Sequence, residues 1–533
     1  MASIEARRLL HSLVMIQCEK WTYDAPASDW LVANGLATQQ DFGDKTTEFG
    51  LTSAGGKIMS ELEGYLKVVD YSKFCETKKP SVLEFGFDTD DICPALFPFQ
   101  RDIVKTSLKR GRSAIFAERG LGKTLMQLSW AQAVCKHTDG KVLILAPLAV
   151  SQQTIREGEK FGIPVKYATT QSDCSDSITI TNYERLANFN PSEFSGVVLD
   201  ESSILKAYTG KTKRELVRAF KATQFKLACS ATPSPNDHME LGNHSEFLGI
   251  MESNEMLARW FIVDTQLQAG NYRLKGHASR DFWDWVSSWA MMASKPSDVS
   301  PEYDDSTFVL PEMSIIKHCI GVDIVEGRGD GMLLRIPEMS ATSVHRERRI
   351  SSNQRAKEAA ALIKAEPDEP WLIWADTDYE AEAVVKELDG VCNVKGSSSL
   401  EHKEEKLIGF SQGDPLWLLT KPKIAGFGMN WQHCARVLFV ASTFSFESWY
   451  QAIGRCHRFG QTRPVHVHMV FGHTEAEVMN ILERKRQEFG TMQKSMFAAA
   501  RRRQHDKRDV GDYHPTIEMQ IPEWLTSQTI EGQ

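Results

Sequence analysis

Short apolar runs alternate with stretches of helical spacing in two regions of the chain, and the first region begins near Phe97. Runs that are apolar at consecutive positions are typical of strands covered by helices on both faces of a parallel sheet. Several of these runs end in polar or turn-forming residues, and ligands bind at the carboxyl ends of such strands. The predicted strands of the first region are Ala114–Phe116, Val142–Ala146, Ile178–Ile180, Gly196–Leu199 and Lys226–Cys229.

A second region with the same alternation follows later in the chain. Strands that alternate with helical stretches favour an α/β fold with a parallel sheet. We therefore predict two tandem α/β domains, one at residues 91–250 and one at residues 351–485, each with helices on both faces of its sheet. The predicted strands of the second domain are Trp371–Trp374, Leu416–Leu419, Arg436–Val440 and Val465–Val470.

The alternation is lost between these domains, and residues 251–350 are predicted to be a helical insertion that links them. Large apolar side chains fall on one helical face of this insertion. A face of this kind could stack on nucleic-acid bases, but a buried packing face is the more common use of such residues. The residues of this face are Phe282, Trp285, Val286, Trp289 and Met292.

Two smaller segments flank the predicted domains. Residues 1–90 show helical spacing, then a short strand near residues 48–52, a turn and a second amphipathic stretch from Lys57. This order fits a winged-helix module, and it fits a generic helical cap equally well. Residues 486–533 contain three consecutive arginines at 501–503 and are predicted to form a basic C-terminal tail, of which Ala498–Gln533 is expected to be an extended arm laid on the body of the protein.

Composition restricts the class of protein. A chain of 533 residues is too long for a single core, and 42% hydrophobic with 25% charged residues is typical of soluble globular proteins. The net charge of −8 does not exclude a nucleic-acid partner, because phosphate contact depends on a local basic lining. Ten cysteines without paired spacing indicate reduced thiols rather than a zinc site. Without a signal peptide or a long apolar run, a cytoplasmic location is expected.

The first candidate for chemistry is the stretch from Ala114 to Thr124. A short apolar strand leads into a turn with Gly120 and Gly122, and Lys123-Thr124 open a helix-compatible segment. A strand, a glycine turn and a helix N-terminus form an anion cradle, because unpaired N–H groups and the helix dipole point at one spot. Lys123 would contact the β- and γ-phosphates of a nucleotide, and Thr124 would ligate Mg²⁺. The alternative is a glycine turn with an incidental lysine.

The second candidate is Asp200-Glu201, which follows the predicted strand Gly196–Leu199. A carboxylate at that strand end could hold the Mg²⁺ already bound by Thr124, and its neighbour could orient and deprotonate a water molecule. By position, we assign Asp200 to the metal and Glu201 to the water. The alternative is a carboxylate that caps a helix N-terminus.

The third candidate lies in the second domain. On a helix, Gln451, Arg455 and Arg458 would fall at i, i+4 and i+7, along one face. Arginine stays charged and binds phosphate through two hydrogen bonds, so two guanidinium groups there suit a shared anionic target. Supplied from the second domain, they would act as arginine fingers on the γ-phosphate. The alternative is a surface stripe of arginines.

In this order and spacing, the segments resemble the Swi/Snf-type branch of the superfamily two helicases and translocases, over residues 95 to 485. Residues 97–100, ending in Gln100, look like the glutamine motif that reads adenine, and residues 118–124 are similar to motif one. Asp200-Glu201 resembles the DEAH-type motif, with Ser203 where histidine is usual. Residues 451–461 closely match motif six, and the trailing Gly460-Gln461 favours this branch.

The resemblance implies two RecA-like domains that enclose ATP and Mg²⁺. It assigns catalytic roles to Lys123, Glu201, Gln451, Arg455 and Arg458, and metal binding to Thr124 and Asp200. Nucleotide binding would involve Gln100, Gly120, Gly122, Lys123, Thr124 and Gly428, the last in a segment that looks like motif five. Contacts to DNA, largely independent of base sequence, are implied for Pro147, Lys206, Thr232, Gly426, Asn430 and Gln432.

Three functions compete at this point. The first is a DNA-stimulated ATPase that translocates on duplex or branched DNA, in a compact form similar to phage or bacterial members of the family. The second is a helicase that separates strands. The third is an ATP-gated nucleic-acid clamp or recruitment protein with little turnover. Under each of them, residues 1–90 are the candidate site for a protein partner. A clamp has no need for a water-activating carboxylate together with two arginines, so the residues favour an enzyme.

Overall fold

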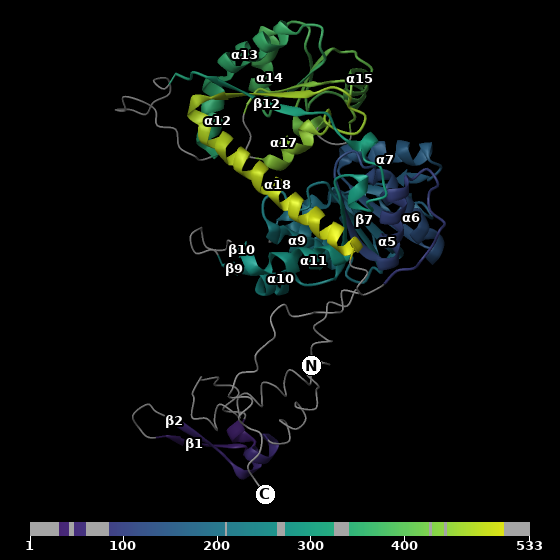
Figure 1. The fold of residues 1–533 in the computed structure, drawn as a ribbon, viewed down its shortest axis with the longest axis vertical. Helices are drawn as coiled ribbons and strands as arrows, with labels where there is room; N and C mark the ends of the chain where they lie inside the picture. The colour runs from purple at the N-terminus through teal and green to yellow at the C-terminus, as the bar shows by residue number, and fades with distance from the viewer. Residues whose placement is uncertain are drawn as a thin grey trace. The chain divides into compact units, whose positions relative to one another are not determined.

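The computed structural model describes residues 31–41, 47–59, 85–207, 210–263, 272–323, 341–425, 429–441 and 445–505. The chain divides into two compact units, one made of residues 1–81 with 508–533 and the other of residues 82–507. Figure 1 labels the helices and strands of both units. All of the predicted site residues belong to the second unit.

The smaller unit contains an antiparallel pair of strands, β1 (Ala37–Asp41) and β2 (Thr47–Leu51). β2 confirms the strand predicted near residues 48–52, whereas β1 has too few apolar residues to be apparent from its sequence. The helix predicted from Lys57 begins already at Ser53. Most of the other predicted helical stretches of this unit lie outside the described residues. A winged-helix module and a helical cap both remain open for it.

The first α/β domain, called lobe 1 from here on, is built on a seven-stranded sheet in which every pair of neighbours is parallel. It confirms the five predicted strands. In spatial order the strands are β11 (Ala290–Ala293), β3 (Arg112–Ala117), β8 (Phe225–Cys229), β7 (Phe194–Asp200), β4 (Lys141–Ala146), β6 (Ile178–Asn182) and β5 (Val165–Tyr167). Its helices are α5 (Pro98–Arg110), α6 (Lys123–Thr138), α7 (Leu148–Lys160), α8 (Lys211–Ala219), α9 (Leu241–Leu248), α10 (Ser253–Trp260) and α11 (Ser279–Trp289).

Both faces of this sheet are buried. Consecutive side chains of a strand point to opposite faces, so Phe116 of β3 packs on one side and Ile115 on the other. α5 and α6 belong to the core that contains Ile115, and α9 and α11 to the core that contains Phe116. This double cover explains why the strands read as continuous apolar runs.

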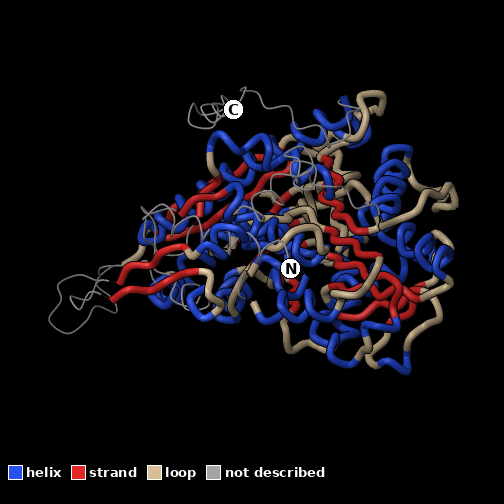
Figure 2. The backbone as a smooth tube through the Cα atoms, turned by 90° about the horizontal axis from the view of Figure 1, so that it is seen from below, coloured by secondary structure: helices blue, strands red, loops and turns tan. Residues whose placement is uncertain are grey.

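The second α/β domain, called lobe 2, has a six-stranded sheet that is also entirely parallel. It confirms the four predicted strands, and Figure 2 shows the strands of both sheets in red. In spatial order they are β12 (Met313–Ile320), β17 (Val465–Gly472), β16 (Arg436–Phe439), β13 (Trp371–Trp374), β15 (Trp417–Thr420) and β14 (Cys392–Val394). Its helices are α12 (Ala341–Ile350), α13 (Ser352–Ala365), α14 (Asp378–Glu387), α15 (Leu400–Ser411), α16 (Pro422–Ala425) and α17 (Phe446–Ile453).

The predicted insertion at residues 251–350 differs from the structure, because strands from it complete both sheets. β11 pairs with β3 in lobe 1, and β12 pairs with β17 in lobe 2. The sequence pattern misses β11 because it is only four residues long and directly follows an apolar helix. It misses β12 because lysine and histidine interrupt the apolar residues of that strand.

The aromatic face predicted within residues 251–350 is a packing face. Phe282, Trp285 and Trp289 on α11 are almost completely buried, and the ring of Trp285 lies 4.7 Å from that of Trp260. These side chains therefore hold α11 against the sheet of lobe 1. The alternative prediction, that they stack on bases, is wrong for these residues. Met292 lies beyond the helix, on β11.

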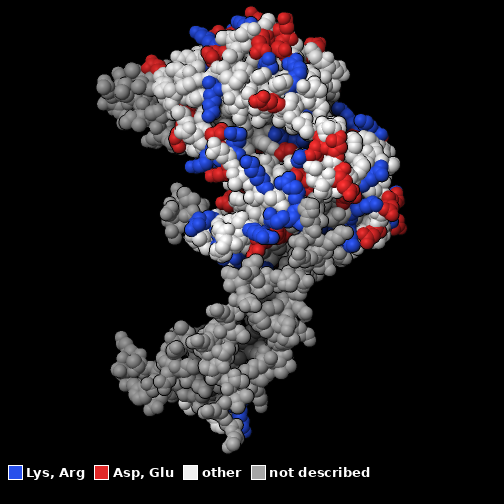
Figure 3. Space-filling view, viewed as in Figure 1, with Lys and Arg blue, Asp and Glu red and all other residues white. Residues whose placement is uncertain are grey.

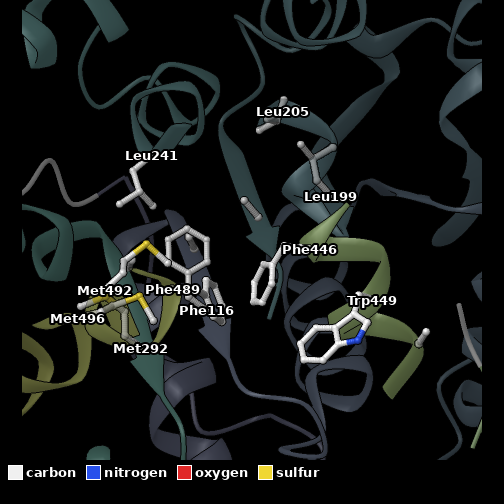
Figure 4. Packing of buried hydrophobic residues seen from close by; sticks show 14 of the residues in the cluster. Phe116, Leu199, Leu205, Leu241, Met292, Phe446, Trp449, Phe489, Met492 and Met496 are labelled. Carbon is white, nitrogen blue, oxygen red and sulfur yellow. The ribbon is translucent and has the colours of Figure 1, made fainter. Parts of the chain in front are cut away.

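A single long helix, α18 (Ala476–His505), follows the last strand of lobe 2 and packs against lobe 1. Figure 4 shows Phe489, Met492 and Met496 of this helix gathered around Phe116 and Met292 of lobe 1. The apolar core of lobe 1 therefore continues into α18 and, through Phe446 and Trp449, into α17 of lobe 2.

The end of α18 is fixed to lobe 1 by ion pairs. The Arg501 guanidinium lies 2.8 Å from a carboxylate oxygen of Asp298, and that of Arg502 lies 2.6 Å from Asp284. The prediction of an extended arm from Ala498 is therefore wrong as far as His505, where α18 ends, and the remainder lies outside the described residues. Figure 3 shows basic side chains gathered where α18 crosses between the lobes in Figure 1.

Within the described ranges, no helix is both long and apolar enough to cross a lipid bilayer. The cysteines in the same ranges are free thiols, and Cys93, Cys229, Cys434 and Cys456 are buried.

Candidate active site

The loop from Glu118 to Gly122 joins the carboxyl end of β3 to the N-terminus of α6, and it is called the phosphate loop from here on. Gly120 and Gly122 have φ angles of 88° and 76°, in the left-handed region that favours glycine. Ala117 is the last residue of β3 and is fully buried. The strand–turn–helix arrangement predicted for an anion cradle is therefore present.

Lys123 lies across the phosphate loop. Its ammonium donates to the main-chain oxygen of Ala117 at 2.7 Å and to that of Glu118 at 3.3 Å. Burial lowers the pKa of this ammonium, while the carboxylates of Glu201, Glu118 and Asp200 act in the opposite direction. The lysine is thus held by weak, neutral acceptors in an acidic surrounding, which suits a group that binds an incoming anion.

Gln100 supports the same loop from α5. Its side-chain amide accepts a hydrogen bond from the Phe97 N–H at 2.9 Å and donates to the carbonyl oxygen of Leu121 at 2.9 Å. The side chain is 4% exposed, and a Cβ atom at Gly122 would collide with it. Gln100 therefore positions the loop, and its role as an adenine reader stays a prediction.

Asp200 ends β7, and Glu201 begins the turn that follows it. Glu201 has φ 53°, a strained value for a residue other than glycine, and such strain is concentrated at functional sites. Its Oε2 atom is buried without a hydrogen-bond partner among the described residues. It precedes a short 3₁₀ helix (Ser202–Lys206) but makes no side-chain cap to it, so the capping alternative is wrong.

The two carboxylates differ from ordinary surface carboxylates in their affinity for protons. Burial, followed by the charge of Asp200, raises the pKa of Glu201 to about 7, although Lys123 and Arg455 oppose that shift. Burial also raises the pKa of Asp200. A carboxylate that titrates near neutrality is well matched to taking a proton from water.

A magnesium ion would find two protein ligands here. Within the described residues, no group of three or more His, Cys, Asp and Glu side chains could hold a metal. The hydroxyl of Thr124 and the carboxylate of Asp200 are oxygen ligands of the kind that Mg²⁺ prefers, with its remaining positions filled by phosphates and water. The residues therefore fit a magnesium ion that arrives together with a nucleotide.

Arg455 and Arg458 do not lie on the helix that the spacing predicts. α17 ends at Ile453, where the N–H of Gly454 bonds back to Tyr450 and Ala452, and both arginines occupy the turn beyond it. They nevertheless converge, because each guanidinium donates to the carbonyl oxygen of Met429, at 3.3 and 3.4 Å. Gln451 remains on α17 and is buried.

The guanidinium groups of these two arginines are in a buried environment, unlike those of surface arginines. Burial lowers the pKa of Arg455 to about 9 and that of Arg458 to about 10, and the neighbouring positive charges add to the effect. The charge of Arg455 acts on Glu201 of lobe 1. The Arg458 Nε atom is buried without a partner in the described residues. The surface-stripe alternative is therefore wrong.

The arginine-bearing turn packs directly on the phosphate loop. A Cβ atom added to Gly120 would lie 2.6 Å from the Phe459 nitrogen, and one added to Gly454 would collide with the Arg119 guanidinium. Arg119 also donates to the carbonyl oxygen of Tyr450. The predicted meeting of the two lobes at the phosphate loop is thus present in the structure.

The residues predicted to contact DNA have different surroundings. Asn430 is exposed and Pro147 is half-buried, whereas Gln432 donates to the Phe459 carbonyl oxygen at 3.1 Å. Lys206 forms an ion pair with Glu447 of lobe 2. Thr232 is fully buried, so its side chain cannot make the expected DNA contact in this arrangement. Gly426 and Gly428 lie outside the described residues.

Sequence reasoning missed the residues that join the lobes beside the loop. Glu118 carries a partly buried carboxylate that accepts hydrogen bonds from the Tyr450 hydroxyl of α17 and the Gln493 amide of α18. Tyr450 and Gln493 carry no motif, and their approach to the loop depends on how α18 returns to lobe 1. No local pattern could have revealed it.

Comparison with protein families divides the chain at the same place as the structure. The family described as DEAD/DEAH box helicase matches residues 97–241, which contain Lys123, Asp200 and Glu201. The family described as helicase conserved C-terminal domain matches residues 354–460, which contain Arg455 and Arg458. The two matched segments fall in lobe 1 and lobe 2 and carry the residues that meet at the phosphate loop.

Several known proteins are similar to the chain. The ATP-dependent DNA helicase DDM1 of Arabidopsis thaliana is 23% identical over 68% of this chain and 56% of its own length. The uncharacterized ATP-dependent helicase YqhH of Bacillus subtilis is 23% identical over 73% of this chain and 78% of its own length. The chromodomain-helicase-DNA-binding protein 1-like of Danio rerio is 37% identical over 15% of this chain, which is 8% of that protein.

Among solved structures, the Sulfolobus solfataricus SWI2/SNF2 ATPase core in complex with dsDNA is 18% identical to the chain. The match covers 78% of this chain and 96% of that one, with a TM-score of 0.37.

Proposed function

We propose that the chain, whose residues 97–241 match the DEAD/DEAH box helicase family and whose residues 354–460 match the helicase conserved C-terminal domain, is a Swi/Snf-type DNA-dependent ATPase of superfamily two that translocates on duplex DNA. The observation that supports this most is the meeting of the arginine-bearing turn with the phosphate loop, beside a strained Glu201 whose carboxylate oxygen has no partner in the described residues. Hydrolysis of a triphosphate needs a cradle, a base and positive charge at one place.

Each residue has a stated part in the proposed reaction. Lys123 binds the β- and γ-phosphates, and Gln100 fixes the loop that holds them. Thr124 and Asp200 would hold Mg²⁺, which supplies positive charge to the phosphates when bound. Glu201 orients the attacking water and takes its proton. Arg455 and Arg458 stabilise the charge that develops on the γ-phosphate, and buried guanidinium groups are more effective there than exposed ones.

Movement on DNA would follow from repeated closure and opening of the two lobes. Because catalytic groups come from both lobes, nucleotide turnover changes how firmly the lobes are held together. DNA would be bound mainly through its phosphates, without strong sequence preference. Pro147, Lys206, Asn430 and Gln432 are the proposed contacts, together with the segment that contains Gly426. Remodelling of forks or branched intermediates in replication, recombination or repair is the proposed use.

Steady-state phosphate release, measured without DNA, with single-stranded DNA and with duplex DNA, tests the proposal. Lys123→Ala protein serves as the control for contaminating ATPase. A triplex-displacement assay and a strand-separation assay are run on the same preparation. We expect duplex DNA to stimulate release most strongly, displacement of the third strand in the presence of ATP, and no separation of a forked duplex.

The other outcomes identify the competing functions. Stimulation mainly by single strands, together with strand separation, would indicate a helicase that unwinds. Tight nucleotide-dependent binding to DNA with no release above the Lys123→Ala control would indicate a clamp, and it would contradict the proposed enzyme.

The proposal also predicts a pH dependence. Glu201 acts as a base only when it is deprotonated, and its pKa is raised to about 7. The kcat/KM for ATP, which reports on the free enzyme, should therefore rise with pH through neutrality and reach a plateau above about 8. Phosphate release at subsaturating ATP between pH 5.5 and 9, with circular dichroism to confirm the folded state, measures it. A flat profile would contradict the role of Glu201.

A further inference from the structure

Glu118, at the start of the phosphate loop, is the centre of a cluster that draws on three segments of the chain. The Tyr450 hydroxyl lies 2.7 Å from each of its carboxylate oxygens, and the Gln493 amide nitrogen lies 2.8 Å from Oε2. The main-chain N–H of Arg119 donates to Oε1 at 2.9 Å. We call the contacts of Tyr450 and Gln493 with this carboxylate the Glu118 tie.

The tie binds a charged carboxylate, not a neutral acid. Although burial acts to raise the pKa of Glu118, the charge of Arg119 and the surrounding hydrogen bonds hold it below its usual value. Burial raises the pKa of the Tyr450 phenol, so Tyr450 stays protonated and acts as a donor. Hydrogen bonds to a charged partner are roughly twice as strong as neutral ones.

A second cation lies beside the main chain of Glu118. The Lys123 ammonium is 3.3 Å from the main-chain oxygen of Glu118, and the charges of the two residues act on each other. Lys123 nevertheless donates to the main-chain oxygens of Ala117 and Glu118 rather than to the side chain of Glu118. An ion pair between them would neutralise the group that the triphosphate needs.

The geometry points to Tyr450 and Gln493 as positioning residues that hold the Glu118 carboxylate away from Lys123 and so leave the ammonium available to the triphosphate. This inference rests on the proposed function of the phosphate loop. The tie needs α17 and α18 in place, because Tyr450 belongs to one and Gln493 to the other. Nucleotide affinity therefore depends on whether lobe 2 and α18 are seated against lobe 1.

Arg119 stabilises the tie from the other side. Its guanidinium lies over the Tyr450 ring, 3.6 Å from the ring centre, and donates to the Tyr450 carbonyl oxygen. A phenylalanine at position 450 would keep the ring and the main-chain contact while losing only the hydroxyl. Tyr450→Phe therefore removes the bond to Glu118 with little disturbance of the lobe contact.

The test is the affinity of a non-hydrolysable ATP analogue with Mg²⁺, measured by calorimetry on the full chain. For the double variant Tyr450→Phe, Gln493→Leu we expect a Kd raised about tenfold, since two hydrogen bonds to a charged group are lost. KM for ATP should rise in parallel while kcat changes less than about threefold. Lys494→Ala, at an exposed position beside Gln493 on α18, is the matched control and should equal wild type.

Rescue separates positioning from general damage. Glu118→Gln added to the double variant should restore the Kd to within about threefold of wild type, because an amide cannot neutralise Lys123. A double variant with unchanged Kd, or a triple variant that stays weak, would overturn the inference alone. Wild-type protein that binds no nucleotide would overturn the proposed function, and the inference with it.

Discussion

Replacing Glu201 by glutamine should reduce DNA-stimulated phosphate release at least about a hundredfold while leaving nucleotide binding intact. A positioned general base contributes about 10²- to 10⁴-fold to the rate, and glutamine keeps the shape of the side chain without its basicity. We expect this variant to fold normally, because Oε2 of Glu201 makes no hydrogen bond within the described residues that the substitution would break. Steady-state phosphate release gives the rate, and calorimetry with a non-hydrolysable ATP analogue gives the affinity for nucleotide.

Lys123→Ala is the companion variant, and it should fail in a different way. Its ammonium lies across the phosphate loop, on the main-chain oxygens of Ala117 and Glu118, so its removal should weaken nucleotide binding as well as turnover. If the Glu201→Gln variant lost nucleotide binding to the same degree as Lys123→Ala, Glu201 would serve folding or binding instead of water activation. Unchanged phosphate release in both variants would remove the proposed active site altogether.

The strands and the phosphate loop could be predicted because local sequence determines them. β3, β4, β7 and β8 are buried on both faces, so their residues form continuous apolar runs that the pattern identifies. Gly120 and Gly122 have positive φ angles that glycine accommodates best, so their spacing alone predicts the turn. The location of Asp200 and Glu201 at the carboxyl end of β7 could be predicted once that strand was identified.

The misplaced residues depend on contacts between distant segments. Spacing puts Arg455 and Arg458 on a helix, but α17 ends at Ile453, and the Gly454 that follows packs against the Arg119 side chain of the other lobe. The same turn still brings both guanidinium groups to the Met429 carbonyl. The pattern therefore identified the chemistry of the two arginines without identifying the backbone that carries it.

α18 is the largest feature that the sequence left undetected. The cluster at 501–503 looks like a basic tail, yet Arg501 and Arg502 pair with Asp298 and Asp284 of lobe 1. A run of positive charge does not reveal whether its partners are phosphates of a ligand or carboxylates of the same chain. Here the acidic partners lie some two hundred residues earlier in the sequence, and only the fold brings them together.

Arg458→Ala should lower DNA-stimulated turnover by about 10³-fold and change the Kd of an ATP analogue by less than about threefold. Arginine fingers contribute about 10³ to 10⁵ to the rate because they stabilise charge that develops only in the transition state. A thousandfold loss corresponds to about 4 kcal/mol of transition-state stabilisation. Arg458→Lys should recover part of the rate, since lysine supplies the charge without the two-pronged geometry.

Arg458 gives a cleaner test than Arg455, because the two side chains differ in the main-chain oxygens to which they donate hydrogen bonds. Arg455 donates to the main-chain oxygens of Gln451 and Met429, so its removal would also loosen the turn. Arg458 donates only to Met429 among the described residues, at 3.4 Å, and its Nε atom has no partner there. Arg463→Ala, which removes a partly exposed arginine paired with Glu369, is the matched control. If Arg458→Ala abolished nucleotide binding while that control did not, Arg458 would be a structural residue of lobe 2, and the two-lobed catalytic arrangement would lose its main support.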